Sequence, residues 1–539
     1  MRRGLNRLKL NDRKIGFIII VVFIILFFWE GVNGVTTTWI PFDSAYNATV
    51  AANLARHGEY RVSYPAEILF YRKITTGVPL IVPTAIVYKL FGISSITTAS
   101  VSLIYGVLSI LLINYLLFKC LPQKKKSVRL AALLTVLLVL INDFFRAISC
   151  MLIGEIGAVF FILISSALLL RHFETEKQIY AIEAGAFLAF AFLTKNIVIF
   201  LIVTFCGLMI FEIVVMHSIH LKSFICYLLG FIVGFITMDS YKFIVLGGWD
   251  NYLKWWIEEW DELMSQSSGI DMTLSVSEKI NTLDTIFIGC NKYFCVGMIL
   301  LPIFIYGIRV IVNLKNRNWK ISNEMLLMMF LGVGGSSMLV FYLLLGGRVL
   351  GFPRRMAINL ICLYLFITYF VVGLICEILK LVKKEYSNRR KWILQTATMI
   401  FVASTIIIGA FPLGTLIKTT ELYLEKSEKQ YVVELMDVFL EEIDELEDDA
   451  VLFCSGWWQE PNVSLFLDRK LVDINSHVEV TGPAYFIVGY QYSGDDIARV
   501  EAKLNATLTR IDTSEIDRTR FKATTGNDLE NFAIYKVNY

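Results

Sequence analysis

A single aspartate, Asp43, lies just beyond the first apolar run of the chain, in the stretch WIPFDSAYNATVAANLARHGEY that begins at Trp39. A carboxylate in that place has two roles open to it. It can act as a general base that removes a proton from a hydroxyl group. It can equally cap the short helix that follows, whose apolar residues recur at four-residue spacing and which ends at Gly58. Both roles remain open from these residues alone.

Other charged residues interrupt apolar runs further along the chain. They are Glu155, Lys195 and the pair Arg354 and Arg355 in GGRVLGFPRRMAIN. Ionisable side chains within or at the edge of a bilayer are costly and tend to be functional. Each also has a simpler explanation: Glu155 could cap its helix, Lys195 could extend to lipid headgroups, and the arginines could bind lipid phosphate. The topology derived below places all of them at one face of the membrane, together with Asp43.

The composition of the chain is that of a membrane protein. Of its 539 residues, 56% are hydrophobic and only 18% are charged, with a mean hydropathy of +0.62. Soluble domains are about 45–50% apolar and about 25% charged. The apolar residues also come in long blocks, which predicts a polytopic α-helical membrane protein. Basic residues flank these blocks instead of covering one face, so nucleic-acid binding is not expected.

The apolar blocks and the basic loops together predict a topology. A spanning helix needs about 20 mostly apolar residues. Candidate spans cover residues 15–33, 97–119, 129–144, 152–171, 179–194, 196–216, 223–246, 293–313, 324–346, 356–379 and 392–414. With about eleven spans and the N-terminus inside, the basic loops FKCLPQKKKSVR and KKEYSNRRK face the cytoplasm, as the positive-inside rule requires. The C-terminal tail then lies outside.

The run at 77–92 decides this topology, because counting it as a span would turn the later basic loops outward. Its length and its two prolines, Pro79 and Pro83, favour a short helix that lies in the outer interface or re-enters the membrane. It belongs to a large first outer loop, residues 34–96. A second outer loop at 247–291 carries Trp249, Trp255, Trp256 and Trp260, which predicts an amphipathic helix at the membrane interface. A sugar-stacking platform is the alternative.

The tail changes character near residue 415. A charged run, SEKQYVVELMDVFLEEIDELEDD, has a helical apolar stripe, and the shorter runs AVLFCS, VSLFL, AYFIVGY and FAIYKV read as strands. We therefore predict a small extracytoplasmic α/β domain at 415–539, following a transmembrane domain at 1–414.

Four stretches, in their order along the chain, resemble the successive signatures of the GT-C superfamily: FDSAYNATVAANLARHGEY, TTGVPLIVPTAIVYKLFGISS, FLAFAFLTKN and FPRRMAINLICLYLF. Members of this superfamily are integral membrane glycosyltransferases that use polyprenyl-phosphate-linked sugars. The style is that of bacterial family-39-like enzymes, which include aminoarabinose transferases and protein O-mannosyltransferases. The resemblance covers roughly residues 15–380 and leaves the tail unmatched.

The resemblance implies roles for particular residues. Asp43 matches the family's catalytic acid position and would be the base for the acceptor hydroxyl. Arg354 or Arg355 would hold the donor phosphate, which suits the bidentate fork of arginine, and Lys195 is a weaker candidate. The family often has two adjacent acids, whereas Ser44 follows Asp43 here. The candidates for a second acid are Glu67 and Glu155, and we predict neither a metal site nor another cofactor.

The resemblance also implies partners and a location. The donor would be a polyprenyl-phosphate sugar, the acceptor a lipid, glycan or protein of the envelope, and the location a bacterial cytoplasmic membrane. Two other functions stay open. A transporter or flippase for a lipid-linked glycan usually shows repeated halves, and we find no internal repeat. A non-catalytic envelope scaffold or sensor would fit the absence of the second acid.

Overall fold

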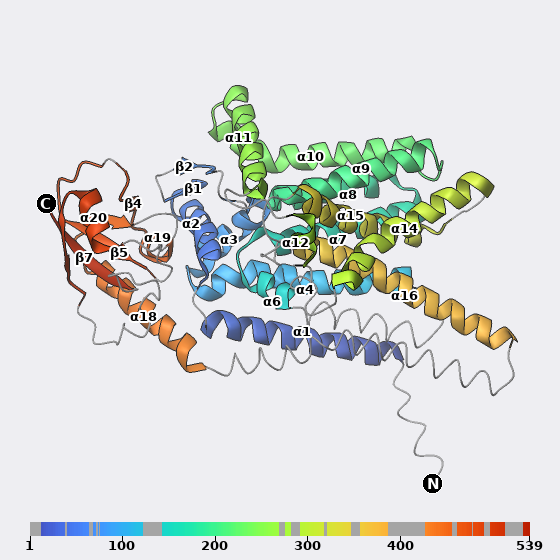
Figure 1. Cartoon of the computed structure of the whole chain (residues 1–539), viewed down its shortest axis with the longest axis horizontal. Helices are drawn as coiled ribbons and strands as arrows, with labels where there is room; N and C mark the ends of the chain where they lie inside the picture. Colours follow the sequence, from blue (N-terminus) through green and yellow to red (C-terminus); the bar gives the residue numbers. More distant parts are fainter. Residues whose placement is uncertain are drawn as a thin grey trace, which may run out of the picture.

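The structure is a computed structural model of the whole chain. It describes residues 12–37, 40–63, 68–71, 74, 76–121, 143–268, 275–281, 292–316, 321–345, 356–385, 426–454, 461–476, 478–489, 496–512 and 532–539. Within these ranges a bundle of long helices adjoins a small domain that contains the larger of two sheets (Figure 1).

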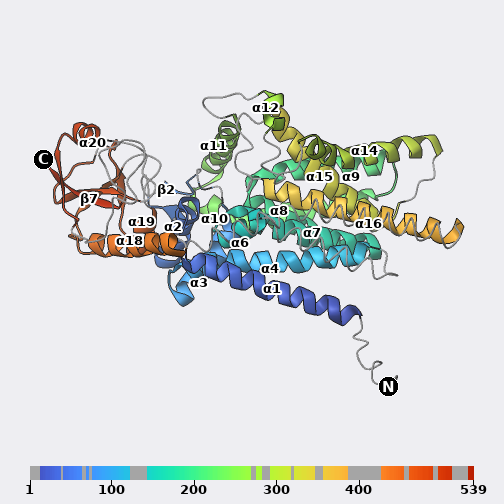
Figure 2. The ribbon, with the colours of Figure 1, turned by 60° about the horizontal axis from the view of Figure 1, so that its bottom comes forward.

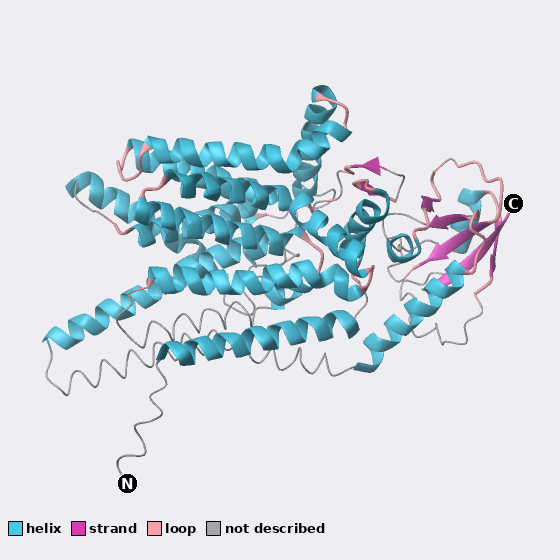
Figure 3. Cartoon of the chain, turned by 180° about the vertical axis from the view of Figure 1, so that it is seen from behind, coloured by secondary structure: helices cyan, strands magenta, loops and turns pink. Residues whose placement is uncertain are grey.

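The bundle consists of long apolar helices that run side by side (Figures 1 and 3). Six of the described helices are long and apolar enough to cross a membrane: α4 (Ser95–Cys120), α7 (Gly154–Thr175), α9 (Ile199–Val214) with the 3-10 turn before it, α10 (Leu221–Val245), α14 (Lys292–Asn316) and α15 (Asn323–Leu345). Apolar side chains on α10 are exposed, among them Ile225 at 54% and Ile236 at 60%. An apolar surface of this kind suits lipid, and the chain is a multi-pass membrane protein.

Three further predicted spans are helices of the bundle: α1 (Asp12–Thr37), α8 (Gln178–Thr194) and α16 (Ala357–Glu385). The predicted span at 392–414 lies outside the described residues. So does most of the span at 129–144, whose last two residues open the short helix α6 (Asp143–Cys150). The total of about eleven spans therefore stays a prediction.

Small residues let helices α8 and α10 approach closely. A Cβ atom added to Gly185 would lie 1.9 Å from the Tyr227 carbonyl oxygen, and one added to Gly230 would lie 1.9 Å from that of Ile182. Gly234 lies one helical turn further on and faces Ala186. Close backbone approach at small residues is a common way for membrane helices to associate, since lipid provides no hydrophobic drive between them.

A buried ion pair joins α9 to α14. The Arg309 guanidinium donates two hydrogen bonds to the Glu212 carboxylate, one of them with Nη2 2.8 Å from Oε2. The Tyr306 hydroxyl donates to Oε1 of the same carboxylate at 2.6 Å. Arg309 is 1% exposed and Glu212 is fully buried. Each buried charge thus has its counter-charge beside it, which offsets part of the cost of burying it.

The segment between α1 and α4 forms a small folded layer at one end of the bundle. It contains α2 (Phe42–His57), a two-stranded hairpin of β1 (Arg61–Val62) and β2 (Ile68–Leu69), and α3 (Val78–Phe91). The run predicted to form a short non-spanning helix is thus the 14-residue helix α3, which contains Pro83 and packs against α2 and α4. We call this end of the bundle the domain-facing end, because the C-terminal domain lies beyond it (Figure 2).

The C-terminal domain is built on a five-stranded sheet in the order β4-β3-β5-β7-β6. The strands are β3 (Val451–Cys454), β4 (Leu471–Asp473), β5 (Ala484–Val488), β6 (Thr507–Arg510) and β7 (Ala533–Asn538). Strand β3 is parallel to β4 and β5, whereas β7 is antiparallel to β5 and β6. Helices α18 (Lys426–Asp444), α19 (Pro461–Leu467) and α20 (Ile497–Leu504) accompany the sheet. An α/β domain with one long leading helix is confirmed.

One strand prediction in this domain is wrong. The run VSLFL, residues 463–467, belongs to helix α19 and not to a strand. Pro461 occupies the first helical position, where its fixed φ angle and missing N–H favour a helix start. Four apolar residues and one serine are too short a run for their period to separate a buried strand from a buried helix. The runs AVLFCS, AYFIVGY and FAIYKV do contain strands, namely β3, β5 and β7.

The C-terminal domain and the layer at the domain-facing end share one apolar core. Val50 and Ala51 of α2 are buried in the same cluster as Leu435 of α18 and Leu465 of α19. Helix α19 packs directly on α2, and α18 contacts α1. Burial of apolar area contributes about 25 cal/mol per Å². The domain is therefore held against the helix that carries Asp43.

Candidate active site

Asp43 lies in the first turn of α2 and is not the N-cap of this helix, one of the two roles that the sequence left open. Pro41 occupies the N-cap position, and no side chain caps the helix. The carbonyl of Pro41 instead accepts the first helical hydrogen bond, from the Ala45 N–H at 2.8 Å. The predicted end of the helix is confirmed, since Gly58 adopts a left-handed conformation with φ of 76°. The half-buried Asp43 carboxylate is thus not needed as a cap, and it lies near the positive end of the helix dipole.

Two buried hydrogen bonds attach the first half of α2 to the start of α7. The Leu152 N–H donates to the Ser44 hydroxyl at 2.7 Å, and the Asn47 side-chain amide donates to the Leu152 carbonyl at 2.8 Å. Ser44 is 2% exposed and Asn47 is 6% exposed. The residue that follows Asp43 is therefore fixed to a backbone segment three residues before Glu155. The serine that stands where the family often has a second acid has this structural role.

Glu155 and Lys195 form an ion pair at the same end of the bundle. Lys195 Nζ lies 3.2 Å from Glu155 Oε1, and the side chains are 16% and 2% exposed. Glu155 is in the first turn of α7, and Lys195 follows the last turn of α8. Both charges therefore complement the dipoles of their helices. Within the described ranges, Glu155 Oε2 has no hydrogen-bond partner and is buried.

Two glycines bring the backbones around this pair together. A Cβ added to Gly154 would lie 2.4 Å from the Thr194 carbonyl oxygen, and one added to Gly77 would lie 1.6 Å from the Leu193 carbonyl oxygen. The Gly77 N–H also donates to the Thr194 carbonyl at 3.2 Å. The start of α3, the start of α7 and the end of α8 thus meet at one point.

We predict that Gly77→Ala destabilises the protein by about 1–3 kcal/mol, because the added methyl group would overlap a backbone oxygen that cannot rotate away. Gly77 has an ordinary φ of −99°, so the effect would come from the clash alone. Thermal unfolding in nanodiscs would measure it. Gly207→Ala in α9 is the matched control, since a Cβ there meets nothing within 4 Å. Equal melting temperatures for both variants would contradict the prediction.

A second polar cluster lies where α10 turns into α11 (Trp249–Ser268). The Lys242 ammonium lies 2.9 Å from Asp239 Oδ1 and 3.6 Å from the centre of the Trp255 ring. The Trp256 indole donates to Asp239 Oδ2 at 3.2 Å, and the Trp255 indole donates to the Phe70 carbonyl at 2.6 Å. This cluster was not predicted. Its only sequence signal is the spacing of Asp239 and Lys242 at the end of an apolar run.

The predicted interfacial belt in this region stays a prediction for Trp249 and Trp260 and does not fit Trp255 and Trp256. Trp249 and Trp260 are 61% and 48% exposed, as expected for an interface. Trp255 and Trp256 instead face Lys242 and Asp239. The predicted helix itself is confirmed as α11.

Helix α11 also reaches the turn that carries Lys195. The side-chain amide of Asn196, the next residue, donates a hydrogen bond to the Glu259 carboxylate. Glu259 is 5% exposed. The backbone on either side of Lys195 is therefore constrained by α3 through Thr194 and by α11 through Asn196.

The structure brings together Asp43, Glu155 and Lys195 at the domain-facing end. Arg354, Arg355 and Glu67 lie outside the described residues, so their predicted roles remain untested. Among the residues with described side chains, no group of three or more histidine, cysteine, aspartate or glutamate residues is placed to hold a metal ion.

The fold is similar to that of two crystal structures of ArnT from Cupriavidus metallidurans. The structure bound to undecaprenyl phosphate has a TM-score of 0.58 and 12% sequence identity, and the alignment covers 97% of both chains. The apo structure has a TM-score of 0.57 and 11% identity, again over 97% of both chains. No protein-family model and no curated protein matches the sequence.

The similarity extends through the C-terminal domain, which the four motif stretches do not cover. The predicted fold, a polytopic helical membrane protein with a C-terminal α/β domain, is confirmed by this similarity. At 12% identity the similarity establishes the fold alone.

Proposed function

We propose that this chain is a glycosyltransferase that moves a sugar from a polyprenyl-phosphate donor to an envelope lipid, glycan or protein. One observation carries the proposal: within a GT-C fold, Asp43 sits half-buried at the start of α2, next to a residue hydrogen-bonded to the segment that leads into Glu155. A half-buried carboxylate beside a fixed backbone is suited to accept a proton in a defined position.

The proposed reaction is a displacement at the anomeric carbon. The acceptor hydroxyl oxygen attacks this carbon, and its proton passes to the Asp43 carboxylate. The bond between the anomeric carbon and the phosphate oxygen breaks, and polyprenyl phosphate leaves with the electron pair. Cations near the phosphate would stabilise the charge that develops on it.

The ion pair between Glu155 and Lys195 helps to assign the remaining roles. Lys195 is paired with a buried carboxylate, so its charge is already compensated. A compensated cation attracts a phosphate less strongly than a free one does. We therefore assign the donor phosphate to Arg354 and Arg355, and assign Lys195 and Glu155 to holding the junction of α7 and α8. Asp43 remains the base.

We predict that Arg354→Ala and Arg355→Ala each raise the KM for the donor about tenfold or more and change the KM for the acceptor less. Loss of a charged hydrogen bond to phosphate costs about 1.5–3 kcal/mol. Initial rates at varied donor and acceptor concentrations would test this. Arg171→Ala is a suitable control, because that exposed guanidinium stacks on Tyr180 at the opposite end of α7. Equal effects on both substrates would argue for a structural role of the two arginines.

The proposed orientation places the C-terminal domain and the site at the outer face of a bacterial cytoplasmic membrane, with the N-terminus inside. Figure 1 supports opposite sides for the start of α1 and the C-terminal domain, because α1 begins at the end of the bundle far from that domain. The basic loops predict which end is inside.

The function can be tested with purified protein in lipid nanodiscs. A panel of polyprenyl-phosphate sugars is supplied with envelope extract, and the donor lipids are followed by mass spectrometry. Consumption of one donor, with release of the free polyprenyl phosphate, would support a transferase and identify its sugar. Binding of a donor without consumption would favour a transporter or a sensor instead.

A further inference from the structure

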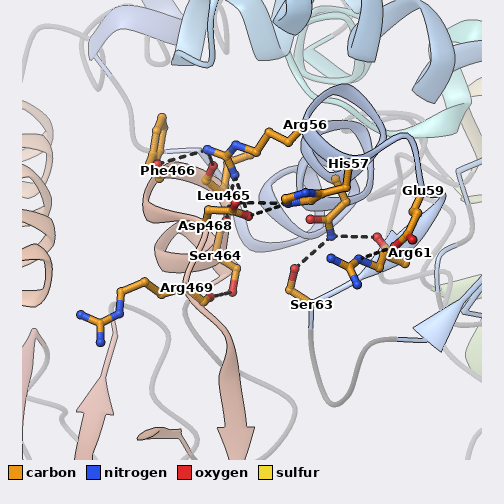
Figure 4. Close-up of polar contacts among 11 residues, drawn as sticks. Arg56, His57, Glu59, Arg61, Ser63, Ser464, Leu465, Phe466, Asp468 and Arg469 are labelled. Carbon is orange, nitrogen blue, oxygen red and sulfur yellow. Dashed lines mark hydrogen bonds and ion pairs between the residues drawn. The ribbon is translucent and has the colours of Figure 1, made fainter. Parts of the chain in front are cut away.

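The last turn of α2 is joined to α19 of the C-terminal domain by one arginine. The Arg56 guanidinium donates to the carbonyls of Leu465 at 3.0 Å and Phe466 at 3.2 Å, and more weakly to that of Ser464 at 3.5 Å. Its Nη1 also lies 3.3 Å from Asp468 Oδ1. Figure 4 shows these contacts converging on a single side chain.

These carbonyls are the ones that α19 cannot satisfy by itself. The last four carbonyls of a helix lack an intrahelical partner. Helix α19 ends at Leu467, and Asp468 follows with a positive φ of 57°, so the chain turns away there. Arg56, which lies more than 400 residues earlier in the sequence, therefore caps the C-terminal end of a helix in another domain.

Two further contacts reinforce the joint. His57 Nε2 lies 3.2 Å from Asp468 Oδ2, so neighbouring residues of α2 engage both oxygens of one carboxylate. Beneath the polar contacts, Leu465 and Val463 are fully buried in the apolar core shared with α2. The apolar contact holds α2 and α19 close together, and the directional hydrogen bonds also fix their relative orientation.

Helix α2 is consequently held at both ends. Its first turns are fixed to the bundle through Ser44 and Asn47, and its last turn is fixed to the domain through Arg56. Arg56 follows Asp43 by 13 positions, which is about 20 Å along a helix rising 1.5 Å per residue. A rigid helix transmits a tilt at one end to a displacement at the other.

We infer that Arg56 is a positioning residue: through its cap on α19, the C-terminal domain sets the orientation of the helix that presents Asp43. The inference rests on the proposed function of Asp43. It assigns the domain a part in the reaction rate, in addition to any contact with the acceptor.

The test compares Arg56→Ala and Arg56→Lys with the wild type in nanodiscs. Lysine keeps the positive charge and lacks the planar fork that reaches several carbonyls at once. Arg469→Ala is the matched control, because Arg469 caps α18 within the domain, donating to the carbonyls of Ile443 at 2.8 Å and Glu447 at 2.6 Å. Hydrogen exchange reports on the joint, and donor turnover reports on the reaction.

We expect Arg56→Ala to speed amide exchange in α19 and in the last turn of α2, and to lower kcat about tenfold with little change in either KM. Arg56→Lys should fall between it and the wild type. Arg469→Ala should speed exchange after Ile443 and leave kcat within twofold. Faster exchange in α19 with an unchanged kcat would overturn the inference, as would unchanged exchange in Arg56→Ala. If the wild type consumes no donor, the proposed function fails, while the exchange data still report whether the joint exists.

Discussion

Asp43→Asn is expected to lower sugar transfer by about a thousandfold or more while the protein still folds and inserts. Asparagine has nearly the same shape as aspartate and cannot take up the proton of the acceptor hydroxyl. Loss of a positioned general base typically costs about 10²–10⁴ in rate. The folded state should lose little, because Pro41 and not Asp43 occupies the N-cap. The interaction of the carboxylate with the helix dipole contributes about 0.3–1 kcal/mol.

The measurement is the initial rate of donor consumption together with a thermal melt. Asp250→Asn provides a matched control, because Asp250 holds the same second position of its helix, α11, and is exposed. Both variants should melt within a few degrees of the wild type, and only Asp43→Asn should be inactive. An inactive protein that is also lost from the membrane would mean that the carboxylate matters for folding first.

Lys195→Met is expected to destabilise the protein by about 3–5 kcal/mol. It would leave Glu155, which is 2% exposed, as a buried charge without its cation. Glu155→Gln should cost less, since Lys195 is 16% exposed and can reach water. Thermal unfolding of the two single variants in nanodiscs measures this asymmetry.

The double variant Glu155→Gln with Lys195→Met separates structure from chemistry. It removes both charges at once, so it should recover much of the stability lost in Lys195→Met alone. If the pair only holds the junction of α7 and α8, turnover should recover as well. A stable double variant without activity would return Lys195 to the list of donor-phosphate ligands.

Local sequence patterns predicted much of the bundle and the ends of several elements. The end of α2 at Gly58 follows from the freedom of glycine to adopt positive φ. The short length of α3 follows from the length and prolines of its run, and its non-spanning position stays a prediction. The start of α2 was harder to predict from the sequence. In Pro41-Phe42-Asp43, moving the N-cap by two residues decides whether Asp43 caps the helix or lies at its second position. Boundaries of that size depend on which carbonyl accepts the first hydrogen bond.

What the sequence could not reveal depends on contacts between distant segments. Nothing in the local sequence of Arg56 or of VSLFL indicates that one caps the other. The inward turn of Trp255 likewise depends on Lys242 and Phe70, which come from two other elements. The pairing of Glu155 with Lys195 required knowing that α7 and α8 are antiparallel neighbours. Hydropathy predicts where helices lie in the chain and leaves their partners open.

The buried pair of Glu212 and Arg309 has a consequence for how the protein is made. The two residues are 97 positions apart, and Glu212 leaves the ribosome first. At about 5–20 residues per second, its carboxylate waits roughly 5–20 seconds before its cation has been synthesised. During that time a lone charge in lipid is strongly unfavourable. We therefore expect the Glu212 end of helix α9 to stay in an aqueous part of the insertion machinery until α14 arrives. The ion pair would thus couple the stable insertion of α9 to the later synthesis of α14.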